Sequence, residues 1–392
     1  MRLLILVIIL SITGSGIATA NYVEEPKDIR SLIRGKNFEQ VEKYLDELLI
    51  SEEPKKIYSE YRSVIVTLEQ HCEIEKALEF INKYIVRYPD YSGDDNLYLR
   101  QGLFLTDLNR YQEAVESLER FVDNFKGSIF ELSARHRLGL IYFRTQEYEK
   151  AEYNHKFYME KEKRITPYGD YLAALDLLDV YFGWGKMEEA KKIIDEGLDL
   201  FCKDNKDYRD YYNAYYMKQA EYYFIQKDWG NYKKVNRLPV PFYIKVFLGG
   251  FISKFKKMDR IYKYRHNEDF VDAYINHRLW KHEEMLNIQI DENQLDKKQK
   301  LALQTMRGVA YYWLNKKEKA SEDLKEANRK GNFLLDEASY YAALIEFEKG
   351  NYKEAEKELK NYRSLWVSDV PEGTELVRRL DSKFGRLKFF GE

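Results

Sequence analysis

The chain has 392 residues, and its 64 basic and 66 acidic side chains nearly cancel to a formal net charge of −2. It contains only 7 prolines and 20 glycines but 34 tyrosines, and 33% of its residues are charged. So few turn-forming residues exclude a turn-rich all-β sandwich and a collagen-like chain, and a hydrophobic content of 44% excludes simple disorder. The near-neutral charge indicates no general attraction to nucleic acid.

The first twenty residues have the pattern of an export signal. Arg2 precedes an apolar stretch over 3–12, and small residues lead to Ala18 and Ala20, the pattern of a cleavage site. We expect cleavage after Ala20 and a mature protein that is periplasmic or associated with the cell envelope. The alternative is an uncleaved anchor, because residues 3–20 reach the lower limit for spanning a bilayer. No later stretch is long and apolar enough to do so, so we do not expect an integral membrane protein after cleavage.

One short pattern returns along most of the chain: an aromatic or apolar residue, two polar residues and a small residue. It occupies positions 38–41, 74–77, 111–114, 148–151, 187–190, 270–273, 317–320 and 352–355, with a degenerate copy at 229–232. The step between copies, 35 to 47 residues, is typical of helical repeat proteins. In several copies a second small residue lies twelve positions before the last residue of the pattern. Because small residues let two helices approach closely, each unit is predicted to be a helix, a short turn and a second helix.

Small residues twelve positions apart resemble the signature of the tetratricopeptide-repeat superfamily. The best matches are Gly102 with Ala114, Gly139 with Ala151, and Gly308 with Ala320. The resemblance covers residues 29–367, and its 37-residue spacing is most similar to the bacterial envelope versions of the repeat. It implies an all-α fold, a right-handed superhelical solenoid of about nine helix hairpins. The expected organisation is a signal peptide (1–20), N-terminal repeats (21–231), a basic aromatic insertion with the first helix of a divergent repeat (232–266), C-terminal repeats (267–367) and a C-terminal cap or tail (368–392).

The resemblance also implies a concave groove that is lined by the first helices of the hairpins and binds a partner. The candidate groove residues are Asn96, Asp107, His136, Arg144, Asp179, Tyr312, Trp313, Tyr340 and Glu348. They combine charged, amide and aromatic side chains, as protein-binding surfaces do. The alternative for each of them is that it simply faces solvent or caps a neighbouring helix.

The stretch 232–266 differs in charge from the rest of the chain. This stretch contains ten Lys and Arg residues but only one acidic residue, Asp259, and Phe and Tyr residues are interleaved with the basic ones. One interpretation is a long connection followed by an ordinary helix whose apolar stripe packs on its neighbours. The other is a basic docking surface for an anionic membrane, a polysaccharide or an acidic protein. Its candidate residues are Lys245, Lys254, Lys256, Lys257, Arg260, Lys263 and Arg265.

The sequence contains no constellation typical of a catalytic, cofactor or metal site. His277 and His282 are five positions apart, so they diverge around a helix and do not form an i, i+4 metal-binding pair. Cys72 and Cys202 are separated by a long helical array and are expected to be unpaired, buried thiols. Asp291 with Gln294 has the spacing of a capping box and predicts that a helix through Leu314 begins there.

These observations predict a non-enzymatic scaffold of the bacterial cell envelope, without cofactor or metal. Its partners would be proteins or peptides held in the groove, as parts of an assembly, secretion or motility apparatus. The alternative is a module that binds polysaccharide, cell wall or a membrane surface through residues 232–266. Nucleic acid is not an expected partner, because an exported protein does not meet it.

Overall fold

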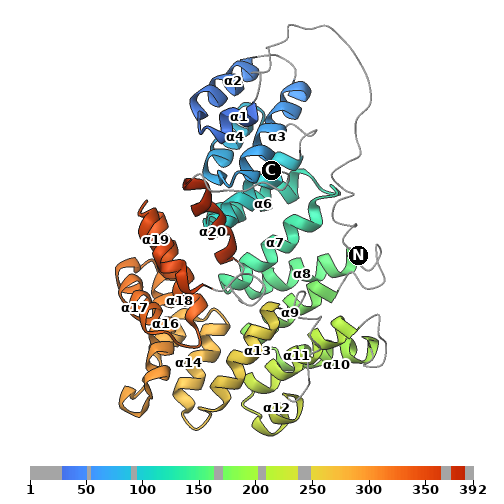
Figure 1. Ribbon diagram of the computed structural model, residues 1–392. Coiled ribbons are helices and arrows are strands. Elements are labelled where there is room, and N and C mark those ends of the chain that lie inside the picture. The colour runs from blue at the N-terminus through green and yellow to red at the C-terminus, as the bar shows by residue number, and fades with distance from the viewer. Residues whose placement is uncertain are drawn as a thin grey trace.

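A computed structural model of the protein describes residues 29–50, 54–89, 95–162, 171–201, 209–236, 249–362 and 372–384. The predicted signal peptide at 1–20, Lys245 and Cys202 lie outside the described residues. The described part is helical and contains no strand, which confirms the predicted all-α solenoid (Figure 1). None of the described helices combines the length and the apolar character needed to cross a bilayer.

The helices form two arrays. The first array consists of α1 (Ile29–Arg34), α2 (Phe38–Ile50), α3 (Pro54–Gln70), α4 (Ile74–Arg87), α5 (Asp95–Asp107), α6 (Tyr111–Asn124), α7 (Glu131–Arg144), α8 (Tyr148–Glu162), α9 (Tyr171–Trp184), α10 (Met187–Phe201), α11 (Arg209–Ile225) and α12 (Trp229–Val235). A single helix, α13 (Gly249–Tyr262), follows. The second array consists of α14 (Glu268–Arg278), α15 (His282–Asn287), α16 (Lys297–Trp313), α17 (Lys317–Lys330), α18 (Leu335–Glu348) and α19 (Tyr352–Glu358), and α20 (Glu372–Lys383) comes last.

Each hairpin has the same turn. A residue with a left-handed backbone, at φ between 55° and 81°, lies two positions before the first residue of every second helix. These residues are Lys36, Cys72, Asn109, Gln146, Gly185, Lys227, Trp280, Asn315 and Gly350. A left-handed residue ends a helix sharply, so only two or three residues separate the paired helices. The described residues thus contain nine hairpins, in agreement with the predicted number.

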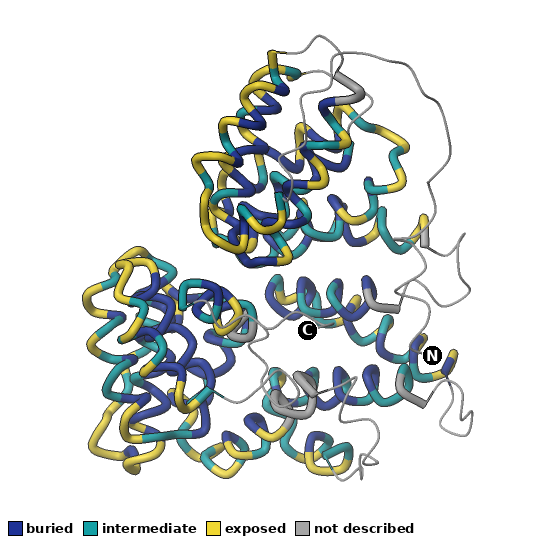
Figure 2. The backbone as a smooth tube through the Cα atoms, turned by 45° about the horizontal axis from the view of Figure 1, so that its top comes forward, coloured by how far each residue is buried: buried dark blue, intermediate teal, exposed yellow. Residues whose placement is uncertain are grey.

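The small residues of the repeat bring the paired helices together. A Cβ atom added to Gly102 would lie 2.5 Å from the Leu118 side chain, and one added to Gly139 would lie 2.6 Å from His155. Ala114 and Ala151, which end the short pattern, are fully buried. Buried residues lie between the helices and exposed residues on the outer rims (Figure 2). The prediction that small residues permit close helix packing is therefore confirmed.

The prediction that positions 270–273 begin a second helix is wrong. Phe270 is the third residue of α14, and no left-handed residue precedes that helix. The turn residue of this unit is Trp280, so α14 is the first helix of its hairpin and α15 is the second. Ala273 lies twelve positions before Met285, as Gly102 does before Ala114. Helix α13 therefore belongs to no hairpin and is an insertion between the arrays.

The predicted start of α16 is also wrong. Asp291 accepts a hydrogen bond from the backbone N–H of Asn293 and caps only the short 3₁₀ turn Glu292–Gln294. The capping box that starts α16 is formed by Asp296 and Gln299. Asp296 accepts hydrogen bonds from the N–H groups of Lys298 and Gln299 at 2.7 and 2.8 Å. A second acidic residue five positions later satisfies the same pattern, and the longer helix begins there.

The inserted helix reverses the direction of the second array. Helices α9 and α11 are parallel. Asp179 of α9 pairs with Lys218 of α11, and the later residue Phe182 contacts the later residue Tyr222. Glu221 of α11 pairs with Arg278 near the end of α14, and Lys227 in the turn after α11 pairs with Asp272 near its start, so these two helices run in opposite directions. Because one extra helix changes the direction of all later hairpins, the second array turns back toward the first, as Figure 1 shows.

Helix α20 completes this arrangement by joining the C-terminal part to the N-terminal repeats. Its residue Ser382 donates a hydrogen bond to Glu73 at 2.8 Å, and Lys383 pairs with the same carboxylate at 3.1 Å. Lys36 pairs with Glu73 at 3.2 Å and donates to the Ser382 carbonyl at 2.8 Å. Burial raises the pKa of Glu73, but the Ser382 hydrogen bond and the two lysines outweigh it and hold the pKa below its usual value. A buried carboxylate thus fixes α20 against α4.

Candidate functional site at the seam between the arrays

The hairpin turns of the first array meet those of the second along a contact zone that we call the seam. Tyr111 stacks on Trp313 with ring centroids 5.3 Å apart. The Arg144 guanidinium lies over the Trp280 ring at 4.7 Å, and the Gln146 side chain donates a hydrogen bond to the Trp280 carbonyl at 3.2 Å. Residues more than 130 positions apart in sequence therefore hold the two arrays together.

Aromatic side chains surround Trp313 on the second array. Its indole N–H donates to the Tyr341 hydroxyl at 3.1 Å, and the His282 ring lies parallel to it at 6.4 Å. His282 is buried, and neither of its ring nitrogens has a hydrogen-bond partner among the described residues. Burial, and then the nearby His277, lower the pKa of His282 to about 3. This ring is therefore uncharged, which suits its aromatic surroundings.

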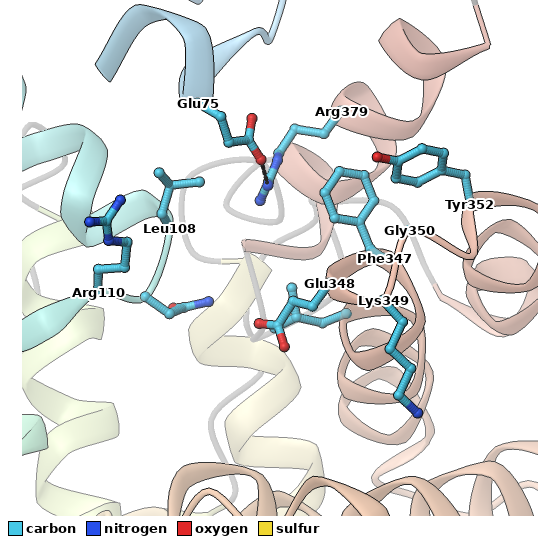
Figure 3. A pocket seen from close by; sticks show the side chains of 11 residues that line it. Glu75, Leu108, Arg110, Phe347, Glu348, Lys349, Gly350, Tyr352 and Arg379 are labelled. Atoms are coloured by element: carbon cyan, nitrogen blue, oxygen red, sulfur yellow. Dashed lines mark hydrogen bonds and ion pairs between the residues drawn. The ribbon is translucent and has the colours of Figure 1, made fainter. Parts of the chain in front are cut away.

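A pocket of about 520 Å³ opens at the seam, beside α20 (Figure 3). We call it the seam pocket. The turn 108–110 of the first array and the turn 348–350 of the second form two of its sides. Arg379 of α20 closes the space between them: it pairs with Glu75 at 2.5 Å, and its guanidinium lies 4.4 Å from the centre of the Phe347 ring. The pocket therefore exists only where the two arrays and α20 meet.

The pocket offers apolar surface framed by fixed charges. Leu108, Leu344 and Phe347 contribute the apolar part. Glu348 accepts hydrogen bonds from Tyr312 and Lys317, both at 2.7 Å. Arg110 is held by two hydrogen bonds to Glu113, at 2.7 and 2.6 Å. Such charges are ordered before any partner arrives, so a partner loses less conformational entropy on binding.

Asp107 lies next to this pocket in sequence and ends α5. Its side chain is exposed to solvent, although many protein atoms lie around it. This desolvation, together with the nearby acids Glu375 and Glu69, raises the pKa of its carboxyl to about 6, against the effect of Arg137. The carboxyl therefore titrates near neutral pH.

The structure brings only some of the predicted groove residues together. Arg144, Trp313, Tyr312 and Glu348 lie at the seam. Asn96, Tyr312 and Tyr340 are buried, and Asn96 accepts a hydrogen bond from Arg100 at 2.9 Å. Away from the seam, His136 is 2.8 Å from Asp176, and Asp179 pairs with the fully buried Lys218. Most of these side chains thus have partners inside the protein.

Sequence reasoning missed other residues of the site. Leu108 and Arg110 belong to a hairpin turn, Arg379 belongs to the C-terminal helix, and Trp280 is the left-handed turn residue of the misplaced unit. Trp280 was missed because the pattern at 270–273 was assigned to a second helix, which hid the turn that precedes α15. No sequence signal could predict that Arg379 reaches Glu75, because this contact depends on the reversal of the second array.

The residues of the predicted basic docking surface differ in their exposure to solvent. Lys256, Arg260, Lys263 and Arg265 are exposed, and the side chain of Lys254 lies outside the described part. Lys257 is buried and pairs with Glu337 of α18 at 2.7 Å, so the prediction that it belongs to an exposed surface is wrong. The apolar face of α13 includes the buried Met258 and Ile261, and Lys257 is drawn inside with it.

Within the described ranges, no three His, Cys, Asp or Glu side chains are grouped closely enough to hold a metal ion. Cys72 is a free, buried thiol, and burial raises its pKa to about 12. This thiol is therefore unreactive at neutral pH.

Comparison with known proteins finds one family match and several similar solved structures. Residues 97–128, which contain most of the α5–α6 hairpin, match the family model of the tetratricopeptide repeat. A tetratricopeptide repeat protein from Parabacteroides merdae is 14% identical, covers 78% of this chain and 98% of its own, and has a TM-score of 0.42. Yeast Tom70 is 14% identical, with 91% and 94% covered and a TM-score of 0.28. No curated protein matches the chain. The matched segment is therefore similar to a tetratricopeptide repeat, and the turn of its hairpin recurs in the other described hairpins.

Proposed function

We propose that the protein is a non-enzymatic scaffold that binds a partner protein or peptide in the seam pocket. The fold suggests an interaction scaffold, and the observation that carries the proposal is the pocket of about 520 Å³ between the turns of the two arrays. A pocket of this size accommodates a few side chains of a peptide. The hairpin turns that form it present backbone and side chains from both arrays to one ligand.

The composition of the pocket indicates the kind of partner. Leu108 and Phe347 suit one or two apolar side chains, and burial of apolar groups supplies most of the binding free energy. Glu348 and Arg110 lie on opposite sides of the pocket and carry opposite charges (Figure 3). A segment with apolar anchors flanked by charges of both signs fits this arrangement, and the charges set its direction.

The experiment is a selection of peptides from an unbiased display library on the purified protein, followed by affinity measurements. The variant Arg110→Glu reverses a charge in the pocket. The matched control is Lys316→Glu, because Lys316 occupies the same position, just before the second helix, in the α16–α17 hairpin. We expect Arg110→Glu to weaken the selected peptides about tenfold, roughly 1.4 kcal/mol, and Lys316→Glu to leave them unchanged. Equal affinity for both variants would place the binding site elsewhere.

We further propose that the scaffold acts in the bacterial cell envelope, as part of an assembly, secretion or motility apparatus. The support is the export pattern of residues 1–20. The intact mass of protein isolated from the periplasmic fraction tests this: the mass should correspond to a chain that begins at Asn21. A chain that keeps Met1 in the membrane fraction would instead favour the uncleaved anchor.

A further inference from the structure

A second pocket, of about 490 Å³, lies at the inserted helix and is separate from the seam pocket. We call it the basic pocket. Arg260, Lys263 and Tyr264 reach it from the end of α13 and the turn after it, and Lys298 from the first turn of α16. The connection between α17 and α18 closes it with Phe333 and neighbouring residues. Three parts of the chain therefore converge on one recess.

The three cations of the basic pocket have no ion-pair partner within 4 Å among the described residues, and no acidic residue lines the pocket. Three acidic residues of these elements have other hydrogen-bond partners. Asp259 accepts a hydrogen bond from Asn236 at 2.9 Å, Asp296 caps α16, and Glu337 pairs with Lys257. The three cations therefore remain unpaired among the described residues, while the Asp296 carboxylate, which interacts with Tyr264, keeps its negative charge beside the pocket.

The walls between these cations are apolar and fixed. The Tyr264 and Phe333 rings stack with centroids 6.4 Å apart. Burial, and then Asp296, raise the pKa of Tyr264, so its hydroxyl remains protonated. Asn332 accepts a hydrogen bond from the Leu334 N–H at 2.6 Å and donates to Thr305 at 3.1 Å, which holds the connection in place. The recess thus combines a rigid aromatic wall with three exposed cations.

We propose that the basic pocket binds an acidic peptide segment, in which carboxylates flank an apolar side chain. The carboxylates would pair with Arg260, Lys263 and Lys298, because charge-assisted hydrogen bonds to Arg and Lys are among the strongest available to a carboxylate. The apolar side chain would lie against Tyr264 and Phe333. A recess between three elements suits a narrow chain better than the plane of a membrane. The proposal does not rest on the seam pocket, which shares no residue with it.

The probe is a fluorescein-labelled peptide with four Glu residues around a Phe-Leu pair, and its affinity is measured by fluorescence anisotropy at several salt concentrations. The test variant reverses Arg260, Lys263 and Lys298 to Glu. The control reverses three other exposed cations, Arg62, Lys126 and Lys360, so both variants change the net charge equally. Thermal unfolding confirms that both variants fold. We expect the test variant to lose at least about tenfold in affinity and the control to stay within about twofold of the unchanged protein.

Other outcomes would overturn the proposal. An equal loss in both variants would mean that only the overall charge attracts the peptide. If a peptide with Ser in place of Phe-Leu bound as tightly as the original peptide, the aromatic wall would not contribute to binding. No binding by the unchanged protein would refute the site. Retention on vesicles with anionic lipid or on an acidic polysaccharide, without peptide binding, would assign the basic pocket to that other ligand.

Discussion

Gly102 shows how one residue sets the distance between paired helices. An added Cβ would lie 2.5 Å from two atoms of Leu118, which real contacts do not tolerate. We predict that Gly102→Ala destabilises the protein by about 1–3 kcal/mol, although Ala is the better helix former, because the overpacked helices must separate. Denaturant unfolding measures the change. In the control Gly230→Ala, where the nearest atom is 3.6 Å away, stability should rise or stay the same.

Buried histidines make the stability depend on pH. Burial lowers the pKa of His155 to about 4 and that of His282 to about 3, whereas the unfolded chain has values near 6.5. Below about pH 6.5 the unfolded chain takes up protons that the folded chain does not, so stability falls as the pH falls. Linkage predicts a loss of roughly 2 kcal/mol per histidine between pH 7 and pH 5. Asp107, whose pKa is raised to about 6, acts in the opposite direction.

The variant His282→Gln tests this pH dependence. The test compares the change in unfolding free energy with pH, so it holds even if the variant is less stable at every pH. The decrease in unfolding free energy between pH 7 and pH 5 should be smaller in this variant than in the unchanged protein. His266 is exposed, so His266→Gln should leave the decrease unchanged. If both variants have the same pH dependence as the unchanged protein, burial of His282 is not the cause.

For single residues, the sequence predicted the positions that recur in the repeats and missed the contacts that occur only once in the molecule. The small residues at Gly102, Gly139 and Ala114 were identified because their spacing returns in several units. Lys257 was placed on an exposed surface because its neighbours are basic, and nothing local indicated Glu337 eighty positions later. A buried ion pair between distant elements has no periodic pattern to reveal it.

At the scale of single elements, the inserted helix α13 is held by a buried charge. Glu337 of α18 accepts hydrogen bonds from Lys257 at 2.7 Å and from His277 at 2.6 Å. Burial alone would raise the pKa of Glu337, but the charges of Lys257 and His277 lower it well below its usual range. One carboxylate thus joins α13, α14 and α18.

We predict that Glu337→Gln destabilises this region by about 3–5 kcal/mol, because it removes the carboxylate that pairs with the buried Lys257 ammonium. Hydrogen exchange should show the loss of protection in α13, α14 and α18, while α2, which packs against α1, α3 and α4, keeps its protection. The double variant Lys257→Met with Glu337→Gln should recover much of the loss. Exchange that rises equally along the whole chain would contradict a local role for the pair.

At the scale of the whole molecule, the closure of the two arrays was not predictable from the sequence. The repeat pattern predicts hairpins that stack on their neighbours, and the described helices confirm it. The seam depends on the odd helix α13 and on side chains at turns, such as Arg144 and Trp280, whose identities differ from one repeat to the next. Short-range periodicity therefore fixes the stacking of the hairpins, and long-range contacts fix the shape that creates the seam pocket.

The distance between the two arrays tests the closure most directly. Spin labels at Glu113→Cys of α6 and Lys353→Cys of α19, both exposed, lie on opposite sides of the seam. Cys202 is replaced by Ser, and the buried Cys72 with its raised pKa does not react. Double electron–electron resonance should give one narrow distribution at the separation in the structure, and removal of residues 372–392 should broaden and lengthen it. A broad, long distribution in the otherwise intact protein would contradict the closed arrangement.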